Sequence, residues 1–386
     1  MKIKEIMSFL LIVLLCTCIS GCVESVKSHS NIKPHSNKLS IVDDINLFSF
    51  KLLKACKSKG NQFISPISIE FALAPIADGA GGNTKTEILK ALCLPSNDSV
   101  RRHDFANLYE HLNTSKNLTI ANALWIQKGY PIKRKYMENV KYYHAEIHYV
   151  NFESERAARE INEWISKETN GKIDKIVSRI NPLTKLAVTN AMFFSGKWKY
   201  MFEETSMKFY SPESVNRVKA IVSISRYNYT NYSGIEAVEI PYANQNYSMI
   251  IVMTNNISLE IFKKLTNNMK TKLIKLYIPE LEIKKGYDLE KPLSKLGIKV
   301  AFTPKANFSG ISNMKLYIGC AKHKTYLKID KNGTVAAAAT YIGVIATAIP
   351  QNYKVVKINR PFYIFIVRNM GKKKLILFSG RIVTVT

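Results

Sequence analysis

Two histidines have the spacing of a metal site, because His144 and His148 lie four residues apart. On a helix this spacing would place both imidazoles on one face, where they could hold zinc. The segment 145–150, Ala-Glu-Ile-His-Tyr-Val, instead alternates in the manner of a strand. On a strand the two histidines stand about 13 Å apart, too far to share one ion. We therefore expect no metal at this pair.

Signatures of an enzyme are missing from the sequence. It contains no Gly-x-Ser-x-Gly nucleophile elbow, no His-Glu-x-x-His zinc motif and no phosphate loop ending in Gly-Lys-Ser/Thr. Beyond Cys22 the cysteines are Cys56, Cys93 and Cys320, too few for a disulfide framework. We expect idle or buried thiols, with one disulfide as the alternative. The sequence thus predicts neither an enzyme nor a bound cofactor.

The most unusual segment runs from Asp330 to Phe362. Between Lys331 and Pro350 it has neither charge nor proline, and a run of small residues leads into a stretch rich in Ile, Val and Thr. Its alanines favour a helix, whereas its β-branched residues and tyrosine favour a strand. An exposed segment of this kind would pair with an open sheet edge. It is therefore either a buried helix with a following strand, or a segment used for strand addition.

The surrounding sequence predicts a mixture of helices and strands. Residues 41–57 have an amphipathic helical pattern, and Gly171 fits the C-cap of a helix that precedes it. Thr84, with Glu87 three residues later, has the spacing of a capping box. Apolar strands are expected at 186–194 and at 235–253, the latter as two strands around a turn.

Several separated motifs resemble the serpin family, and the resemblance extends from about Ser40 to Val385. The quoted motifs, in chain order, are NQFISPISI at 61–69, LAVTNAMFFSGKW at 186–198, NFSGIS at 307–312, DKNGTVAAAAT at 330–340 and RPF at 360–362. The resemblance implies an α+β serpin fold with a large mixed β-sheet, further sheets, surrounding helices and an exposed reactive centre loop. It also implies inhibition of serine proteases.

The resemblance assigns roles to two groups of residues. One group lies where the family has its shutter and breach: Ser65, Ser68, Asn190, Trp198 and His323. The other forms the hinge of the reactive loop: Lys331, Gly333, Thr334, Val335, Ala336, Ala337, Ala338, Ala339 and Thr340. A buried Asn190 needs hydrogen-bond partners, and the family supplies them from Ser65 or Ser68 and from His323.

Counting fourteen residues beyond Gly333 places the reactive bond at Thr347–Ala348, with Ala346–Thr347 and Ala348–Ile349 as alternatives. After cleavage the loop would enter the sheet with alternate side chains facing the core. That inward set is Thr334, Ala336, Ala338, Thr340, Ile342 and Val344. The hinge departs from the family at Lys331 and Val335, where glutamate is usual, and Lys331→Glu is the change expected to repair it.

The first 38 residues are expected to lie outside the folded domain. Residues 1–21 have the pattern of a lipoprotein signal peptide, and Cys22 would carry the lipid. An ordinary secretion signal is the alternative. Residues 22–38 are polar and predict a flexible tether, and 39–386 form the serpin domain. The product is expected to be exported and tethered to the outer face of the cell membrane.

The formal net charge of +27 is high for 386 residues. It could attract a polyanion, although lysines spread along the chain also fit a solvated basic surface. The expected partners are serine proteases with small primary pockets, of elastase-like or subtilisin-like specificity. Membrane contact is expected through the lipid alone, and the protein is expected to be a monomer. The alternative function is a non-inhibitory serpin that binds ligands or acts as a chaperone.

Overall fold

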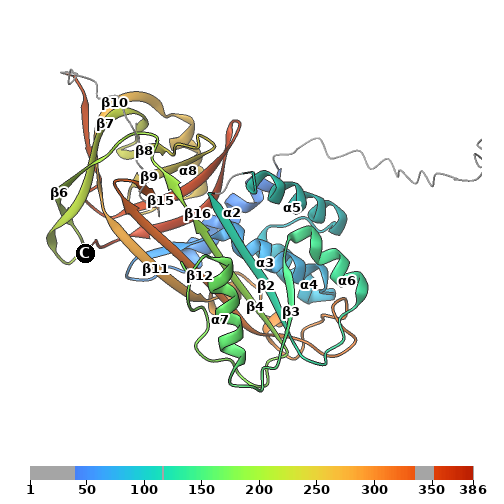
Figure 1. Ribbon diagram of the computed structural model, residues 1–386. Coiled ribbons are helices and arrows are strands. Elements are labelled where there is room, and N and C mark those ends of the chain that lie inside the picture. Colours follow the sequence, from blue (N-terminus) through green and yellow to red (C-terminus); the bar gives the residue numbers. More distant parts are fainter. Residues whose placement is uncertain (1–39, 115–116, 335–351, 386) are drawn as a thin grey trace, which may run out of the picture. The chain divides into compact units, whose positions relative to one another are not determined.

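The computed structural model describes residues 40–114, 117–334 and 352–385. Residues Leu39–Thr386 form one compact unit, in which helices surround two β-sheets (Figure 1). The α+β architecture expected from the sequence is therefore confirmed. The predicted signal peptide and tether, with Cys22, lie outside the described residues. Within the described ranges no helix is both long and apolar enough to cross a membrane.

Helix α3 lies at the centre of the helical side of the unit. Every residue from Pro66 to Ala77 in it is buried, as expected for a helix that is apolar on all sides. The helices are α2 (Ser40–Ala55), α3 (Pro66–Asp78), α4 (Gly82–Leu92), α5 (Asp98–Leu112), α6 (Arg134–Val140), α7 (Ala157–Glu168), α8 (Leu259–Asn267) and α9 (Glu290–Lys295), with 3₁₀ turns at Lys141–Tyr143 and Val300–Phe302.

One sheet has seven strands in the described part of the chain, in the order β3-β2-β4-β12-β13-β5, with β11 beside β12. Its strands are β2 (Leu118–Gln127), β3 (Glu146–Val150), β4 (Leu186–Phe194), β5 (Gly196–Lys197), β11 (Leu281–Asp288), β12 (Ile318–Asp330) and β13 (Gly333–Thr334). Helix α7 crosses one face of this sheet and α3 packs on the other (Figure 1). Strand β4, covered on both faces, is buried along its whole length, which explains its almost unbroken apolar sequence.

The second sheet has nine described strands, in the order β1-β16-β15-β9-β8-β7-β10-β14, with β6 beside β7. They are β1 (Gln62–Ile64), β6 (Glu203–Tyr210), β7 (Val215–Tyr232), β8 (Ile235–Pro241), β9 (Tyr247–Met253), β10 (Lys270–Pro279), β14 (Lys354–Lys357), β15 (Phe362–Met370) and β16 (Lys373–Ile382). The strand pair predicted within 235–253 is present as β8 and β9.

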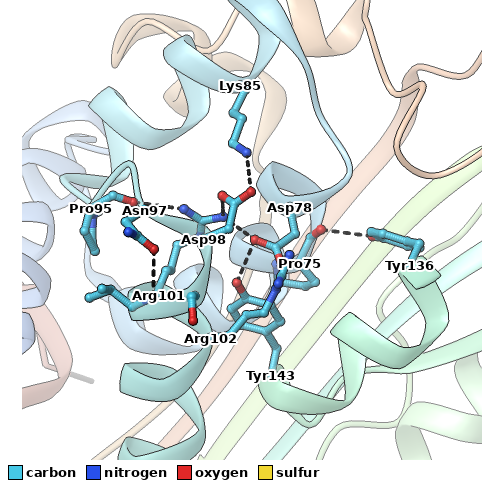
Figure 2. Close-up of polar contacts among 12 residues, drawn as sticks. Pro75, Asp78, Lys85, Pro95, Asn97, Asp98, Arg101, Arg102, Tyr136 and Tyr143 are labelled. Carbon is cyan, nitrogen blue, oxygen red and sulfur yellow. Dashed lines mark hydrogen bonds and ion pairs between the residues drawn. The ribbon is translucent and has the colours of Figure 1, made fainter. Parts of the chain in front are cut away.

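A buried ion network fixes the helices around α3 (Figure 2). The Asp78 carboxylate at the end of α3 accepts hydrogen bonds from the guanidinium groups of Arg101 and Arg102 and from the Tyr143 hydroxyl. The Asp78 and Arg101 side chains are fully buried, and Arg101 also donates to Asp98. Burial strengthens such charge-assisted bonds, so this network holds α5 and the turn after α6 against α3.

The capping box predicted at Thr84 is wrong. The N-cap of α4 is Gly81, so Thr84 is the third residue of the helix and lies within its first turn. Its hydroxyl accepts the Asn307 backbone N–H at 2.9 Å, and the Glu87 carboxylate accepts the backbone N–H of Lys299 and of Val300. Both side chains therefore serve contacts more than two hundred residues away in the chain, which local spacing does not reveal.

Candidate functional site at the loop hinge

The hinge begins where β12 ends. The chain turns back after Asp330, and β13 pairs antiparallel with β12, with Thr334 opposite Ile329. On its other side β13 pairs antiparallel with β5, with Thr334 opposite Gly196. Gly333 has a φ of +149°, and a Cβ there would lie 2.0 Å from the Gly196 carbonyl oxygen. Only glycine fits this close approach of two strands.

Thr334 is held inside the sheet by an aromatic pair. Its side chain is buried, and its hydroxyl lies 2.7 Å from the Tyr242 phenol oxygen. The Tyr242 ring stacks on Trp198, with ring centroids 4.8 Å apart. Trp198 in turn donates its indole N–H to the Asp330 carbonyl at 2.9 Å. The tryptophan assigned to the breach thus contacts the start of the hinge turn, and Tyr242 contacts its end.

Lys331 lies at the outer side of the same turn. Its ammonium is 2.7 Å from the Glu204 carboxylate on β6. Their hydrogen bond lowers the pKa of Glu204 and raises the pKa of Lys331, and Glu280 and Asp330 also raise the pKa of Lys331. The lysine that departs from the family pattern therefore stands among carboxylates, so the fold around it provides the opposite charge.

Below the hinge, β12 and β4 are direct neighbours. They pair in parallel, with His323 opposite Asn190 and Tyr326 opposite Phe193. At the level of the hinge the arrangement changes, because β13 separates β12 from β5, the short strand that follows β4. Among the described residues, β4 and β12 therefore pair directly along most of their length. Only at the hinge does a further strand, β13, lie between β12 and β5.

The structure brings the shutter residues together where β4, β12 and α3 meet. The Asn190 side-chain amide donates to the Ser68 carbonyl oxygen at 2.7 Å and also to the side-chain oxygen of Asn122. Its side-chain oxygen lies 2.6 Å from His323 Nδ1. His323 Nε2 accepts the backbone N–H of Ser65 at 3.1 Å. All five residues are buried, and these bonds satisfy the Asn190 amide and both ring nitrogens of His323, which burial would otherwise penalise.

The partners of His323 define its tautomer. Because Nε2 accepts the Ser65 N–H, the ring proton resides on Nδ1 and is donated to Asn190. Burial lowers the pKa of His323 to about 3, so the ring is neutral at neutral pH. The Ser65 hydroxyl also donates to the Leu377 carbonyl at 2.8 Å, which joins the network to β16. A neutral histidine with both ring nitrogens hydrogen-bonded is positioned to hold strands together rather than to transfer protons.

Sequence reasoning missed three participants in the site. Asn122 lies directly opposite Asn190 on the neighbouring strand, and it could have been found because it is likewise a polar residue within an apolar strand. Tyr242 and Glu204 carry no such signal. A tyrosine after a proline and a glutamate in an alternating strand are ordinary at those places.

Other predicted site residues fall outside the described part of the chain. These are the rest of the hinge, the reactive bond with its alternative, and the lipid site: Val335, Ala336, Ala337, Ala338, Ala339, Thr340, Ala346, Thr347, Ala348 and Cys22.

His144 and His148, the pair with metal-site spacing, each stack on a different aromatic ring. His148 belongs to strand β3 and its ring stacks on Trp125 at 4.7 Å, whereas His144 stacks on Tyr109 at 3.5 Å. The described residues contain no group of three His, Cys, Asp or Glu that could hold a metal ion. The three cysteines in the described ranges are free and half-buried. Burial raises the pKa of Cys56 to about 12 and of Cys320 to about 11, which disfavours their reactive thiolates.

Comparison with known proteins gives consistent matches. A family model described as serpin (serine protease inhibitor) matches residues 43–385. An uncharacterized serpin-like protein of Thermococcus kodakarensis is 34% identical, over 88% of this chain and 85% of its own. Another, from Methanosarcina acetivorans, is 32% identical over 99% of this chain and 98% of its own. The native structure of the thermophilic serpin Tengpin aligns with a TM-score of 0.81 at 29% identity, covering 89% of this chain and 94% of that one.

Proposed function

The chain belongs to the serpin family of serine protease inhibitors, and on that premise we propose that it traps its target as a suicide substrate. The segment that follows the hinge is offered to the protease as a substrate. After cleavage, that segment enters the seven-stranded sheet as a new strand before the acyl-enzyme hydrolyses. The target class is a serine protease with a small primary pocket, of elastase-like or subtilisin-like specificity.

The single observation that carries this proposal is the register of β13. It already lies between β12 and β5 and runs antiparallel to both. Because β12 and β4 run parallel to each other, a strand that continues β13 along the sheet would be antiparallel to both of them. One parallel ladder would be replaced by two antiparallel ones, which are slightly more stable per residue and satisfy the backbone of the inserted strand.

The same register supports the inward set deduced from the sequence. Continuing from Thr334 opposite Ile329, alternate residues of the loop face buried residues of β12. Ala336, Ala338, Thr340 and Ile342 would lie opposite Leu327, Thr325, His323 and Ala321. Val335 would lie opposite Lys328 on the outer face. Small and apolar side chains thus meet the core at each step, without a buried charge to oppose insertion.

The covalent step is ordinary protease chemistry. The protease serine attacks the carbonyl carbon of Thr347, the bond to Ala348 breaks, and the new amine of Ala348 leaves with a proton. An ester then joins Thr347 to the enzyme. A threonine or alanine at this position suits a small pocket, and no Lys or Arg occurs between Lys331 and Lys354 to suit a trypsin-like enzyme.

The N-terminus supports a location for this activity. Residues 1–21 have a lipoprotein-type signal pattern that ends directly before Cys22. We propose that a lipid on Cys22 and the tether 22–38 hold the inhibitor at the outer face of the cell membrane. Mass spectrometry of the membrane fraction of producing cells tests this: a diacylated N-terminal peptide supports the anchor, and an unmodified mature N-terminus contradicts it.

Mixing the chain from Val23 onward with pancreatic-type elastase and with subtilisin tests the function. Denaturing gels and mass spectrometry of the released peptide are the readouts. We expect a denaturant-stable band near the summed mass and a C-terminal peptide that begins at Ala348. Cleavage that leaves the protease active would contradict trapping, and resistance to both enzymes would favour the non-inhibitory alternative.

A further inference from the structure

The strand that follows the reactive loop carries a cluster of lysines. Strand β14 forms the edge of the nine-stranded sheet and pairs in parallel with β10, with Lys354 opposite Ile274 and Lys357 opposite Tyr277. Because side chains alternate along a strand, Lys354 and Lys357 project to opposite faces of this edge. We call these two residues, together with Lys272 and Lys275 of β10, the lysine rim.

Each lysine of the rim is held over a tyrosine ring. The ammonium groups of Lys354 and Lys272 lie 5.0 Å and 5.4 Å from the centroid of Tyr229. Those of Lys357 and Lys275 lie 5.5 Å and 5.8 Å from the centroid of Tyr277, on the other face. Cation–π contacts favour charged ammonium groups in defined positions. The rim therefore presents an ordered set of cations on both sides of one edge.

Much of the charge on the rim is not neutralised within the protein. Lys354 lies 3.5 Å from the Glu236 carboxylate, which Arg360 also approaches at 3.8 Å. Among the described residues, no carboxylate forms an ion pair with Lys272, Lys275 or Lys357. The edge thus keeps a net positive charge that a partner with carboxylates could match.

The lysine rim lies close enough to the proposed reactive bond, 347–348, to contact a protease bound there. From Ala348 to Lys354 the chain spans six residues, which extend to at most about 22 Å. A folded protease of roughly 230 residues has a radius of gyration of about 17 Å, and so a width of about 40 Å. A protease whose active site holds the bond 347–348 must therefore lie over or beside β14.

We propose that the lysine rim is a docking surface for an acidic patch beside the active site of the target protease. This inference rests on the proposed function, and it adds a property of the partner that the loop sequence does not specify. The small residues of the loop select the pocket, and the rim raises the rate at which an acidic protease finds the loop. A polyanionic chain is the competing partner, but β14 is continuous with the segment that a protease binds, which favours the protease.

Salt-dependent association rates test the docking surface. The full-length chain in mild detergent is reacted with two elastase-type proteases, one of acidic and one of basic isoelectric point, from about 20 to 300 mM salt. The variant is Lys275→Gln with Lys357→Gln. The matched control is Lys135→Gln with Lys141→Gln, two exposed lysines on α6 and the turn after it, which removes the same charge elsewhere on the molecule.

We expect the rim variant to react about three- to tenfold more slowly with the acidic protease at low salt, with a shallower salt dependence. The control should behave as the unmodified chain, and the basic protease should not distinguish them. If the chain is cut instead of trapping the enzyme, kcat/KM for cleavage gives the same readout, so failure of the trapping mechanism leaves this test intact. Equal rates and slopes for both variants would overturn the inference. So would a rim variant that loses heparin binding but reacts normally with both proteases.

Discussion

The hydroxyl of Thr334 and the phenol of Tyr242 share a hydrogen bond of 2.7 Å inside the seven-stranded sheet. The first residue of the inward set therefore already occupies a core position while β4 and β12 remain paired below it. The first contacts of the inserted strand would therefore exist before cleavage. Insertion would extend a strand whose first register position is already defined.

A charge at Thr334 should stop this extension. In Thr334→Arg the guanidinium would lie beside Tyr242 at a buried position without a carboxylate partner, which costs several kcal/mol. We expect the yield of covalent complex to fall at least about tenfold, while cleavage at the same bond continues. Densitometry of denaturing gels against residual protease activity measures both quantities.

Val335→Arg provides the matched control, because the continued register places Val335 opposite Lys328 on the outer face. This variant should keep most of the trapping activity. If the two arginine variants lost the complex to the same extent, the register argument would fail.

The ion pair between Lys331 and Glu204 leads to a second prediction, opposite to the one suggested by the family pattern. Lys331→Glu would add a negative charge beside Glu204, Glu280 and Asp330 instead of repairing the hinge. We expect it to raise the number of inhibitor molecules consumed per protease about two- to fivefold, a modest effect because the pair is exposed. The stoichiometry of inhibition is the measurement.

The double variant Lys331→Glu with Glu204→Lys recreates the pair in the reverse orientation and should restore the stoichiometry. An improved stoichiometry in Lys331→Glu alone would show that the family glutamate acts through other partners than these carboxylates.

Acid should weaken the closed sheet through His323. Its pKa in the folded chain is lowered to about 3 by burial, against an ordinary value near 6.5. Between these values the unfolded chain binds one proton more than the folded chain, so stability is lost as pH falls, by about 1.4 kcal/mol per pH unit. Relative to His323→Gln, the urea unfolding midpoint of the unmodified chain, measured from pH 4 to pH 8, should decline below about pH 6.5, whatever slope other titrating groups add.

His323→Gln keeps a polar side chain but removes the titration. It should lower the midpoint at pH 7, because the bonds to Asn190 and Ser65 are altered, and it should flatten the decline below pH 6.5. A variant that retains the full acid dependence would assign that dependence to other groups.

The sequence predicted the structure best at a residue whose polarity differs from that of its neighbours in the chain. Asn190 is a polar residue in an apolar strand, so the need for partners was evident from the sequence, and the structure supplies them from Ser68, Asn122 and His323. The long strands and the amphipathic helices were predictable for a related reason. Their apolar patterns are local and span many residues.

The features that sequence reasoning missed all depend on contacts between distant parts of the chain. Strand β13 has two residues, and its pairing with β5 joins positions more than a hundred residues apart. Glu204 resembles its exposed neighbours until the fold brings Lys331 to it. Thr84 had the local spacing of a cap, yet its hydroxyl binds the Asn307 backbone. In each case tertiary contact outweighs the local preference.

Glu70 on α3 gives the last prediction, because it is a fully buried carboxyl group with no hydrogen-bond partner among the described residues. Burial raises its pKa well above the ordinary value of 4.5, and Cys93 and Asp44 add to the shift. The folded chain therefore holds a proton that the unfolded chain releases, so stability falls as pH rises from about 4.5, by about 1.4 kcal/mol per pH unit.

Glu70→Gln cannot ionise, so we expect a higher urea midpoint at pH 8 and a smaller loss of stability between pH 5 and pH 8. Glu163→Gln, on the exposed side of α7, is the control and should leave that loss unchanged. A Glu70→Gln chain with an unaltered pH dependence would mean that the carboxyl group reaches solvent or a cation when it ionises.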